Sequence, residues 1–89
     1  MKILWPFAAW QQYLDWQRSD PSIVTKINDL IEDIRRDPTG KGKGKPERLT
    51  GVLTGWSSRR ITQEHRLVYR VQGVGEGQTG AVAICVGIG

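Results

Sequence analysis

The chain has 89 residues, of which 38% are hydrophobic, enough for one hydrophobic core and too many for a fully disordered chain. Its single cysteine excludes a disulfide scaffold, and no apolar run approaches the roughly 20 residues that cross a bilayer. These features predict one domain over residues 1–89, in the cytoplasm. The net charge is +4, but residues 1–40 carry −1 and residues 41–89 carry +5. Such a basic half suits a surface that binds a polyanion, or else a solvated face kept for solubility.

The first residues predict a strand followed by a helix. Residues 2–5 form a short apolar run that stops before Pro6, which suits a first strand. Residues 7–18 carry large side chains at intervals of three and four, the spacing of one helix face. This predicted face consists of Phe7, Trp10, Tyr13, Leu14 and Gln17. The tryptophans in and beside this helix are expected in the core or at an interface between subunits.

A second helix is predicted to begin at position 21. Asp20 before Pro21 is a strong helix start, because aspartate caps unpaired N–H groups and proline suits the first turn. The run Asp37-Pro38-Thr39-Gly40 ends the helix, and the two arginines before it suit the helix dipole. The apolar stripe of this helix consists of Ile23, Val24, Ile27, Leu30, Ile31 and Ile34. Two helices with so short a connection form a hairpin, which needs a sheet to cover its apolar faces.

The second half of the chain predicts that sheet. Residues 56–62 and 65–71 form two strands, joined by a tight turn at residues 63–64. In the second strand, Arg66 and Arg70 alternate with mostly apolar residues. One face of this strand is therefore apolar, and the other carries two arginines.

A glycine-rich loop at residues 73–80 and a final apolar strand at residues 81–86 complete the predicted elements. Cys85 is expected to be a buried thiol of that strand. His65, the only histidine, alternates with apolar positions and is expected to be a hydrogen-bonded structural residue. The order of elements predicts an α+β fold, with two N-terminal helices on one face of an antiparallel sheet and the basic surface on the other.

Three lysines alternate with glycines at residues 40–46, which read Gly-Lys-Gly-Lys-Gly-Lys-Pro. The glycine spacing does not match that of a P-loop. The segment still places ammonium groups on a backbone without bulky side chains, which suits contact with phosphates whatever the base sequence. The alternative is a flexible, solvated loop. With one histidine, one cysteine and no ligand spacing among the acidic residues, neither a metal site nor a cofactor is expected.

Several unusual strings occur together in the chain. They include Trp5, Trp10, Tyr13, Trp16, Arg35-Arg36, Gly42-Lys43-Gly44-Lys45-Pro46-Glu47, Gly55-Trp56-Ser57, Arg59-Arg60-Ile61 and Glu64-His65-Arg66-Leu67-Val68-Tyr69. In this order and near this spacing, they resemble the YoeB-like toxins of the RelE/ParE superfamily over residues 1–71. The resemblance implies a RelE-like fold and a toxin of a type II toxin–antitoxin system that cuts messenger RNA in the ribosomal A site. It also implies three partners: the 70S ribosome with its messenger, a YefM-like antitoxin and a second copy of the chain.

The resemblance further implies which residues act on RNA. Metal-free RNA cleavage uses the substrate's own 2′-hydroxyl as nucleophile, so it needs a base for that proton and cations for the charge on phosphorus. The family assigns these catalytic roles to the glutamate of its Lys-Pro-Glu string and the arginine of its His-Arg-Leu-Val-Tyr string, which match Glu47 and Arg66. The RNA-binding residues expected around them are Lys43, Lys45, Arg59 and Arg60.

Two segments depart from the family pattern. The loop at residues 72–80 is longer than the family's usual turn. The family ends in Tyr-His-Tyr, whose final two residues serve the leaving group and the base stack, whereas residues 85–89 here read Cys-Val-Gly-Ile-Gly. Weakened or absent cleavage is therefore expected. Two other functions stay open: an inactive homologue that binds the ribosome or sequesters antitoxin, and an RNA-binding module unrelated to toxins.

Overall fold

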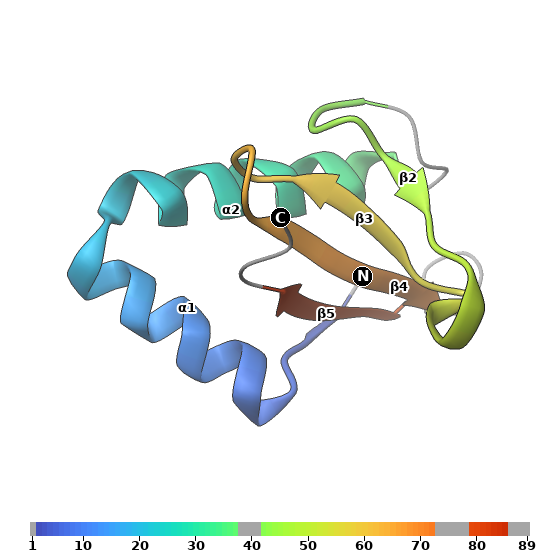
Figure 1. Ribbon diagram of the computed structural model, residues 1–89, viewed down its shortest axis with the longest axis horizontal. Helices are drawn as coiled ribbons and strands as arrows, with labels where there is room; N and C mark the ends of the chain where they lie inside the picture. The colour runs from blue at the N-terminus through green and yellow to red at the C-terminus, as the bar shows by residue number, and fades with distance from the viewer. Residues whose placement is uncertain (1, 38–41, 73–78, 86–89) are drawn as a thin grey trace.

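The structure, a computed structural model, describes residues 2–37, 42–72 and 79–85, with Gln72 and residues 79–85 described by their backbone. The elements in chain order are β1 (Lys2–Leu4), α1 (Phe7–Ser19), α2 (Pro21–Arg36), β2 (Glu47–Arg48), the 3₁₀ helix η1 (Gly51–Leu53), β3 (Ser57–Arg60), β4 (Arg66–Gln72) and β5 (Thr79–Cys85). The strands form one sheet, and both helices lie on the same side of it (Figure 1).

The sheet has the strand order β1-β5-β4-β3-β2. Neighbours from β2 to β5 pair antiparallel, whereas β1 pairs parallel with β5, from Lys2 opposite Thr79 to Leu4 opposite Ala81. Parallel pairing is possible because a long stretch of chain, including both helices, separates the two strands. The predicted α+β fold with an antiparallel sheet is confirmed, and the parallel edge strand adds to it.

The predicted strands recur within one or two residues of their expected ends, as β3, β4 and β5. The predicted turn between β3 and β4 is also present, and the Thr62 hydroxyl accepts the N–H groups of Glu64 at 3.2 Å and His65 at 3.1 Å. β2 and η1 were not predicted, because elements of two and three residues are too short to show a periodic pattern of apolar residues. β2 nevertheless matters for the site, since it places Glu47 opposite Ser58.

Three predictions fall outside the described part of the chain. They concern residues 73–78 of the loop predicted at residues 73–80, the side chain of Cys85 and the tail at residues 86–89. Thr79 and Gly80 were expected in that loop but begin β5 instead. Within the described residues, neither helix is long and apolar enough to cross a membrane.

The core lies between α2 and the sheet. Asp20 caps α2 as predicted, since its carboxylate accepts the Ser22 N–H at 3.2 Å and the Ser22 hydroxyl at 2.6 Å. The predicted stripe of α2 is buried, apart from the half-buried Val24. The core cluster consists of Ile23, Ile27, Leu30, Ile31, Ile34, Ile61, Leu67 and Tyr69. The apolar face of β4 therefore meets α2, as the alternation along that strand predicts.

The predicted face of α1 is partly wrong. Phe7 is 80% exposed and Trp10 is 40% exposed, whereas Ala9 is buried. Tyr13 does pack on the core, and its ring centroid lies 4.9 Å from that of Trp5. Spacing within the helix could not show this arrangement, because Trp5 precedes the helix and supplies the ring against which Tyr13 packs.

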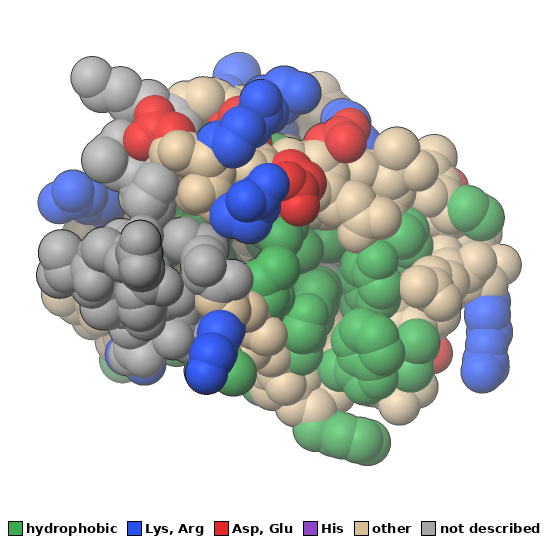
Figure 2. All heavy atoms as spheres, turned by 180° about the vertical axis from the view of Figure 1, so that it is seen from behind, with side chains coloured by type: hydrophobic (Ala, Val, Ile, Leu, Met, Phe, Trp, Pro, Cys, Tyr) green, Lys and Arg blue, Asp and Glu red, His purple; other side chains and the backbone are tan. Residues whose placement is uncertain are grey.

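An apolar patch remains on the surface around the start of α1. We call it the α1 patch, and its exposed large side chains are Ile3, Leu4, Phe7 and Trp10. Figure 2 shows hydrophobic side chains gathered on this helical side of the molecule. Exposed apolar side chains that lie together in this way often mark a contact with another protein.

Truncation of Ile27, which is 0% exposed, tests the packing of α2 on the sheet. Ile27→Ala should lower the free energy of unfolding by about 2–5 kcal/mol, because it removes buried methyl groups and leaves a cavity. Urea denaturation followed by circular dichroism measures the change. Thr25→Ala, at an exposed position of the same helix, is the matched control and should change stability by no more than about 0.5 kcal/mol. Equal effects of the two substitutions would contradict this packing.

Candidate active site

Arg66 and Glu47 meet across three strands. Arg66 begins β4, Ser58 lies in β3, and Glu47 lies in β2. Arg66 Nη2 lies 3.0 Å from Glu47 Oε2, and Arg66 Nε donates a hydrogen bond to Ser58 Oγ at 3.0 Å. The arginine side chain is 17% exposed and the glutamate side chain 64% exposed. The guanidinium is therefore the fixed member of the pair, and the carboxylate is open to solvent.

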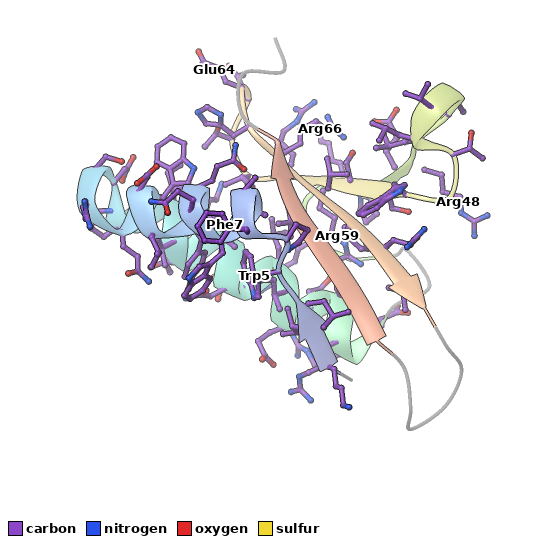
Figure 3. The ribbon with its side chains drawn as sticks, turned by 90° about the horizontal axis from the view of Figure 1, so that it is seen from below. Trp5, Phe7, Arg48, Arg59, Glu64 and Arg66 are labelled. Carbon is purple, nitrogen blue, oxygen red and sulfur yellow. The ribbon has the colours of Figure 1, made fainter. Side chains whose placement is uncertain are left out.

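The pair lies on the sheet face opposite the helices. Along β4, Leu67 and Tyr69 point into the core beside α2, so Arg66 and Arg70 point to the other side. Figure 3 shows Arg66 on the side of the sheet away from the helices. The Arg70 guanidinium lies over the ring of Trp56, 5.0 Å from its centroid. The prediction that β4 presents two arginines opposite its apolar face is confirmed.

An open pocket of about 550 Å³ adjoins Glu47. Glu47 and Arg48 of β2 line it together with Thr50, Trp56 and Tyr69. Its wall mixes a carboxylate, a guanidinium, a hydroxyl and aromatic rings, which is a composition able to contact both the phosphates and the bases of RNA. The sequence alone could not indicate this pocket, because it depends on the two-residue strand β2.

Two of the four cations predicted to bind RNA lie on one loop. We call residues 42–46 the lysine loop, and both Lys43 and Lys45 are exposed on it. Arg60 of β3 is also exposed, and its N–H donates to the Gly44 carbonyl at 2.6 Å. Lys43 and Arg60 line a smaller pocket with Lys26 of α2. The structure thus brings predicted RNA-binding residues together at the edge of β3.

Arg59 is a correction to the predicted RNA-binding set, because its side chain is 0% exposed. Its Nε donates to the Tyr69 hydroxyl at 3.0 Å, and its Nη1 donates to the Asp33 carboxylate and to the Lys43 carbonyl at 3.3 Å. The cause is strand alternation: Arg59 faces α2, whereas its neighbour Arg60 is exposed on the other face. Arg59 is therefore a buried structural residue and not part of the exposed basic surface.

Asp33 of α2 is the charged partner of Arg59. Its Oδ2 also accepts the Lys43 N–H at 3.0 Å, and its Oδ1 lies 3.8 Å from Arg36 Nη2. The Lys43 N–H and then the Arg59 guanidinium hold the pKa of the Asp33 carboxyl below its ordinary value. The ionised carboxylate therefore stabilises the fold fully above about pH 4, the ordinary pKa range of aspartate. This contribution is lost as the pH falls through the lowered pKa of the folded state.

His65 lies away from the Glu47–Arg66 pair. Its ring packs edge-on against Trp16 of α1, with the ring centroids 5.0 Å apart. This contact places the imidazole on the helix side of the sheet. The structural role predicted for His65 therefore agrees with its position.

Comparison with known proteins identifies the family. A family model described as the YoeB-like toxin of bacterial type II toxin–antitoxin systems matches residues 5–82. The chain belongs to the YoeB-like toxin family. The toxin YoeB of Escherichia coli strain K12 is 58% identical over 71 residues, which cover 80% of this chain and 83% of that protein. The toxin YoeB of Streptomyces coelicolor is 50% identical over 70 residues, which cover 79% of this chain and 82% of that protein.

Solved structures of YoeB-like toxins have the same fold. A YoeB/ParE toxin from Agrobacterium tumefaciens superposes with a TM-score of 0.93 and 49% identity, covering 98% of both chains. The toxin in a heterotetrameric YoeB–YefM complex from Staphylococcus aureus superposes with a TM-score of 0.83 and 40% identity, covering 97% of this chain and 94% of that one. The family resemblance read from the sequence is confirmed, and the chain is a toxin of a toxin–antitoxin system.

Sequence reasoning missed three residues that organise the site, namely Ser58, Tyr69 and Asp33. Ser58 and Tyr69 carry no signal of their own, because serine and tyrosine are common in strands. Asp33 does carry a sequence signal, because it is an acidic residue directly beside Ile34 of the apolar stripe. In the structure its side chain is only 15% exposed. A carboxylate beside a core face needs a cationic partner, and that partner is Arg59.

Proposed function

We propose that this toxin cleaves messenger RNA on the ribosome without a metal ion, with Glu47 as general base and Arg66 as the cation that binds the phosphate. The observation that carries the proposal is the 3.0 Å contact between Arg66 Nη2 and Glu47 Oε2. A base and a cation so close together can act on adjacent groups of one nucleotide, the 2′-hydroxyl and its 3′-phosphate. Family membership supports the same activity, because YoeB-like toxins are endoribonucleases.

Cleavage begins when Glu47 accepts the proton of the 2′-hydroxyl. The 2′-oxygen forms a bond to phosphorus, and the bond from phosphorus to the 5′-oxygen of the next nucleotide breaks. The upstream fragment then ends in a 2′,3′-cyclic phosphate. The downstream fragment ends in a 5′-hydroxyl once an acid has protonated the leaving oxygen. Arg66 stabilises the negative charge that builds up on the phosphate oxygens during this step.

The ion pair with Glu47 holds the Arg66 guanidinium in the position where it would bind the phosphate. An arriving phosphate competes with Glu47 for the guanidinium, and the exposed carboxylate is able to turn toward the 2′-hydroxyl. Meanwhile Ser58 Oγ, 3.0 Å from Arg66 Nε, keeps the guanidinium in its direction. The exposed cations Lys43, Lys45 and Arg60 attract the RNA backbone to the same edge of the sheet.

Substitution of Glu47 and Arg66 tests this mechanism. Glu47→Gln should lower the single-turnover rate of cleavage of ribosome-bound messenger by about 10²–10⁴-fold, the usual contribution of a general base. Arg66→Ala should also lower it, because the charge on phosphorus loses its partner. Glu64→Gln, which alters an exposed glutamate of the β3–β4 turn, is the matched control and should cleave like the parent.

Full activity of Glu47→Gln would remove this glutamate from the mechanism. A parent chain that arrests translation and leaves the messenger intact would favour the inactive homologue, which binds the ribosome without cutting RNA. Messenger fragments mapped by primer extension distinguish these outcomes.

The general acid has no histidine or tyrosine candidate among the described residues. His65 packs against Trp16, the Tyr13 hydroxyl donates to Asn28 Oδ1 at 2.7 Å, and the Tyr69 hydroxyl accepts from Arg59. The sequence has no further histidine or tyrosine. The proposal therefore includes slow departure of the 5′-oxygen, and hence slow cleavage.

Restoring the family's final pair tests this part of the proposal. The double variant Ile88→His with Gly89→Tyr should raise the single-turnover rate at least about tenfold, a conservative share of the 10²–10⁴-fold that general acids contribute. Ribosome affinity should change less, because phosphate contacts dominate it. A parent chain that already cleaves as fast as intact family members would rule out a missing acid.

The proposal extends to protein partners. The YoeB toxins of Staphylococcus aureus form a dimer and a heterotetramer with YefM. We propose a second copy and a YefM-like antitoxin as partners of this chain too. The α1 patch supports self-association, which sedimentation of the purified chain measures directly. Because translating ribosomes are the site of cleavage, the proposal locates the toxin in the cytoplasm.

The antitoxin segment that covers the basic surface should be acidic, because residues 41–70 carry a net charge of +6. Opposite charges accelerate encounter, and salt screens them, so the association rate should fall as salt is added. Stopped-flow fluorescence of the chain's tryptophans measures this rate with a YefM-like antitoxin. A rate independent of salt would indicate a mainly apolar interface.

A further inference from the structure

Asp33 and Arg59 join α2 to the loop that leads to the catalytic glutamate. We propose that Asp33 is a positioning residue for RNA cleavage: through Arg59 and the Lys43 N–H, it holds the lysine loop and thereby sets where Lys43 and Glu47 meet the RNA. This inference rests on the proposed function of Glu47.

The first support is that one ion pair holds both backbone groups of Lys43. Asp33 Oδ2 accepts the Lys43 N–H at 3.0 Å, and Arg59 Nη1 donates to the Lys43 carbonyl at 3.3 Å. The next residue is held as well, because the Arg60 N–H donates to the Gly44 carbonyl at 2.6 Å. The exposed Lys43 side chain therefore projects from an anchored backbone.

The second support is the short path from this anchor to Glu47. Gly44, Lys45 and Pro46 alone separate Lys43 from Glu47. Gly44 has φ +80° and Lys45 has φ +49°, so the backbone turns sharply here, and the Pro46 ring restricts it further. A displacement of Lys43 therefore displaces Glu47 as well, because the backbone between them has little conformational freedom.

The third support is the close approach of the loop to α2. Gly42 has φ +113°, and a Cβ at this position would collide with the Asp33 carboxylate. A Cβ at Gly44 would come within 2.8 Å of Leu30 Cδ2. Both glycines have a positive φ and leave little space for a Cβ beside α2, so the loop lies closely against that helix.

The fourth support is the burial of Arg59. Because its side chain is 0% exposed, its charge depends on acceptors within the protein. A neutral residue at position 33 removes one charged acceptor of this guanidinium. Arg59 is then held less firmly, and the loop attached to it shifts. Misplacement of a catalytic group by about 1 Å can cost about 10²-fold in rate.

Asp33→Asn tests the inference, because it removes the charge and keeps the size of the side chain. The single-turnover rate of cleavage at saturating ribosome concentration should fall at least about tenfold, at a temperature where circular dichroism shows the variant folded. Asp15→Asn is the matched control: it removes the same charge from an exposed position in α1 and should cleave like the parent.

Gly42→Ala provides an independent test, because it displaces the loop while leaving both charges in place. It should lower the rate as Asp33→Asn does. Gly51→Ala is its control, since Gly51 also has a positive φ, +69°, but a Cβ there meets nothing within 4 Å. If Asp33→Asn does not fold, the comparison of the two glycine variants still decides the question.

Hydrogen exchange separates this inference from the proposed function. In Asp33→Asn, the Lys43 and Arg60 amides should lose protection while the amides of β4 keep theirs, and this is measurable even if the parent chain does not cleave RNA. A purely structural role predicts a lower melting temperature with an unchanged rate for the folded protein. That result, or unchanged Lys43 protection, would overturn the positioning role.

Discussion

A guanidinium without access to water must find its hydrogen-bond acceptors inside the protein, and this requirement shapes the molecule around Arg59. Its acceptors include the Tyr69 hydroxyl in β4, the Asp33 carboxylate in α2, the Asp37 carbonyl just after α2 and the Lys43 carbonyl in the lysine loop. One side chain therefore joins the sheet, the helix layer and the loop. Since each acceptor depends on the others to keep the charge satisfied, the three segments order together.

Strand alternation places the core residues and the candidate site residues on opposite faces of the sheet. On β4, Leu67 and Tyr69 belong to the core cluster, while Arg66 points to the opposite face and meets Glu47. The same division operates on β3, where Arg59 faces α2 and Ser58 contacts Arg66. The core cluster and the Glu47–Arg66 pair thus share β4 but lie on opposite faces of the sheet.

The sequence correctly predicts the features that depend on a local pattern of residues. The stripe of α2, its cap at Asp20 and the alternation of β4 are periodic or local signals, and the structure follows them. The direction of Arg59 was not accessible in this way. Two adjacent arginines point to opposite faces, and only the register with β2 and β4 decides which one is buried. The exposed face of α1 could not be predicted for a similar reason, because Trp5, against which Tyr13 packs, lies outside the helix.

The pairing of β1 with β5 has a consequence for the synthesis of the toxin. β1 is the first strand made and β5 the last of the described strands, yet β5 is the only strand beside β1. β4, which carries Arg66, also gains its second neighbour only when β5 is present. Contacts between such distant segments form late in folding, after the intervening chain has been made. The nascent chain therefore cannot complete its sheet while β5 is still unsynthesised.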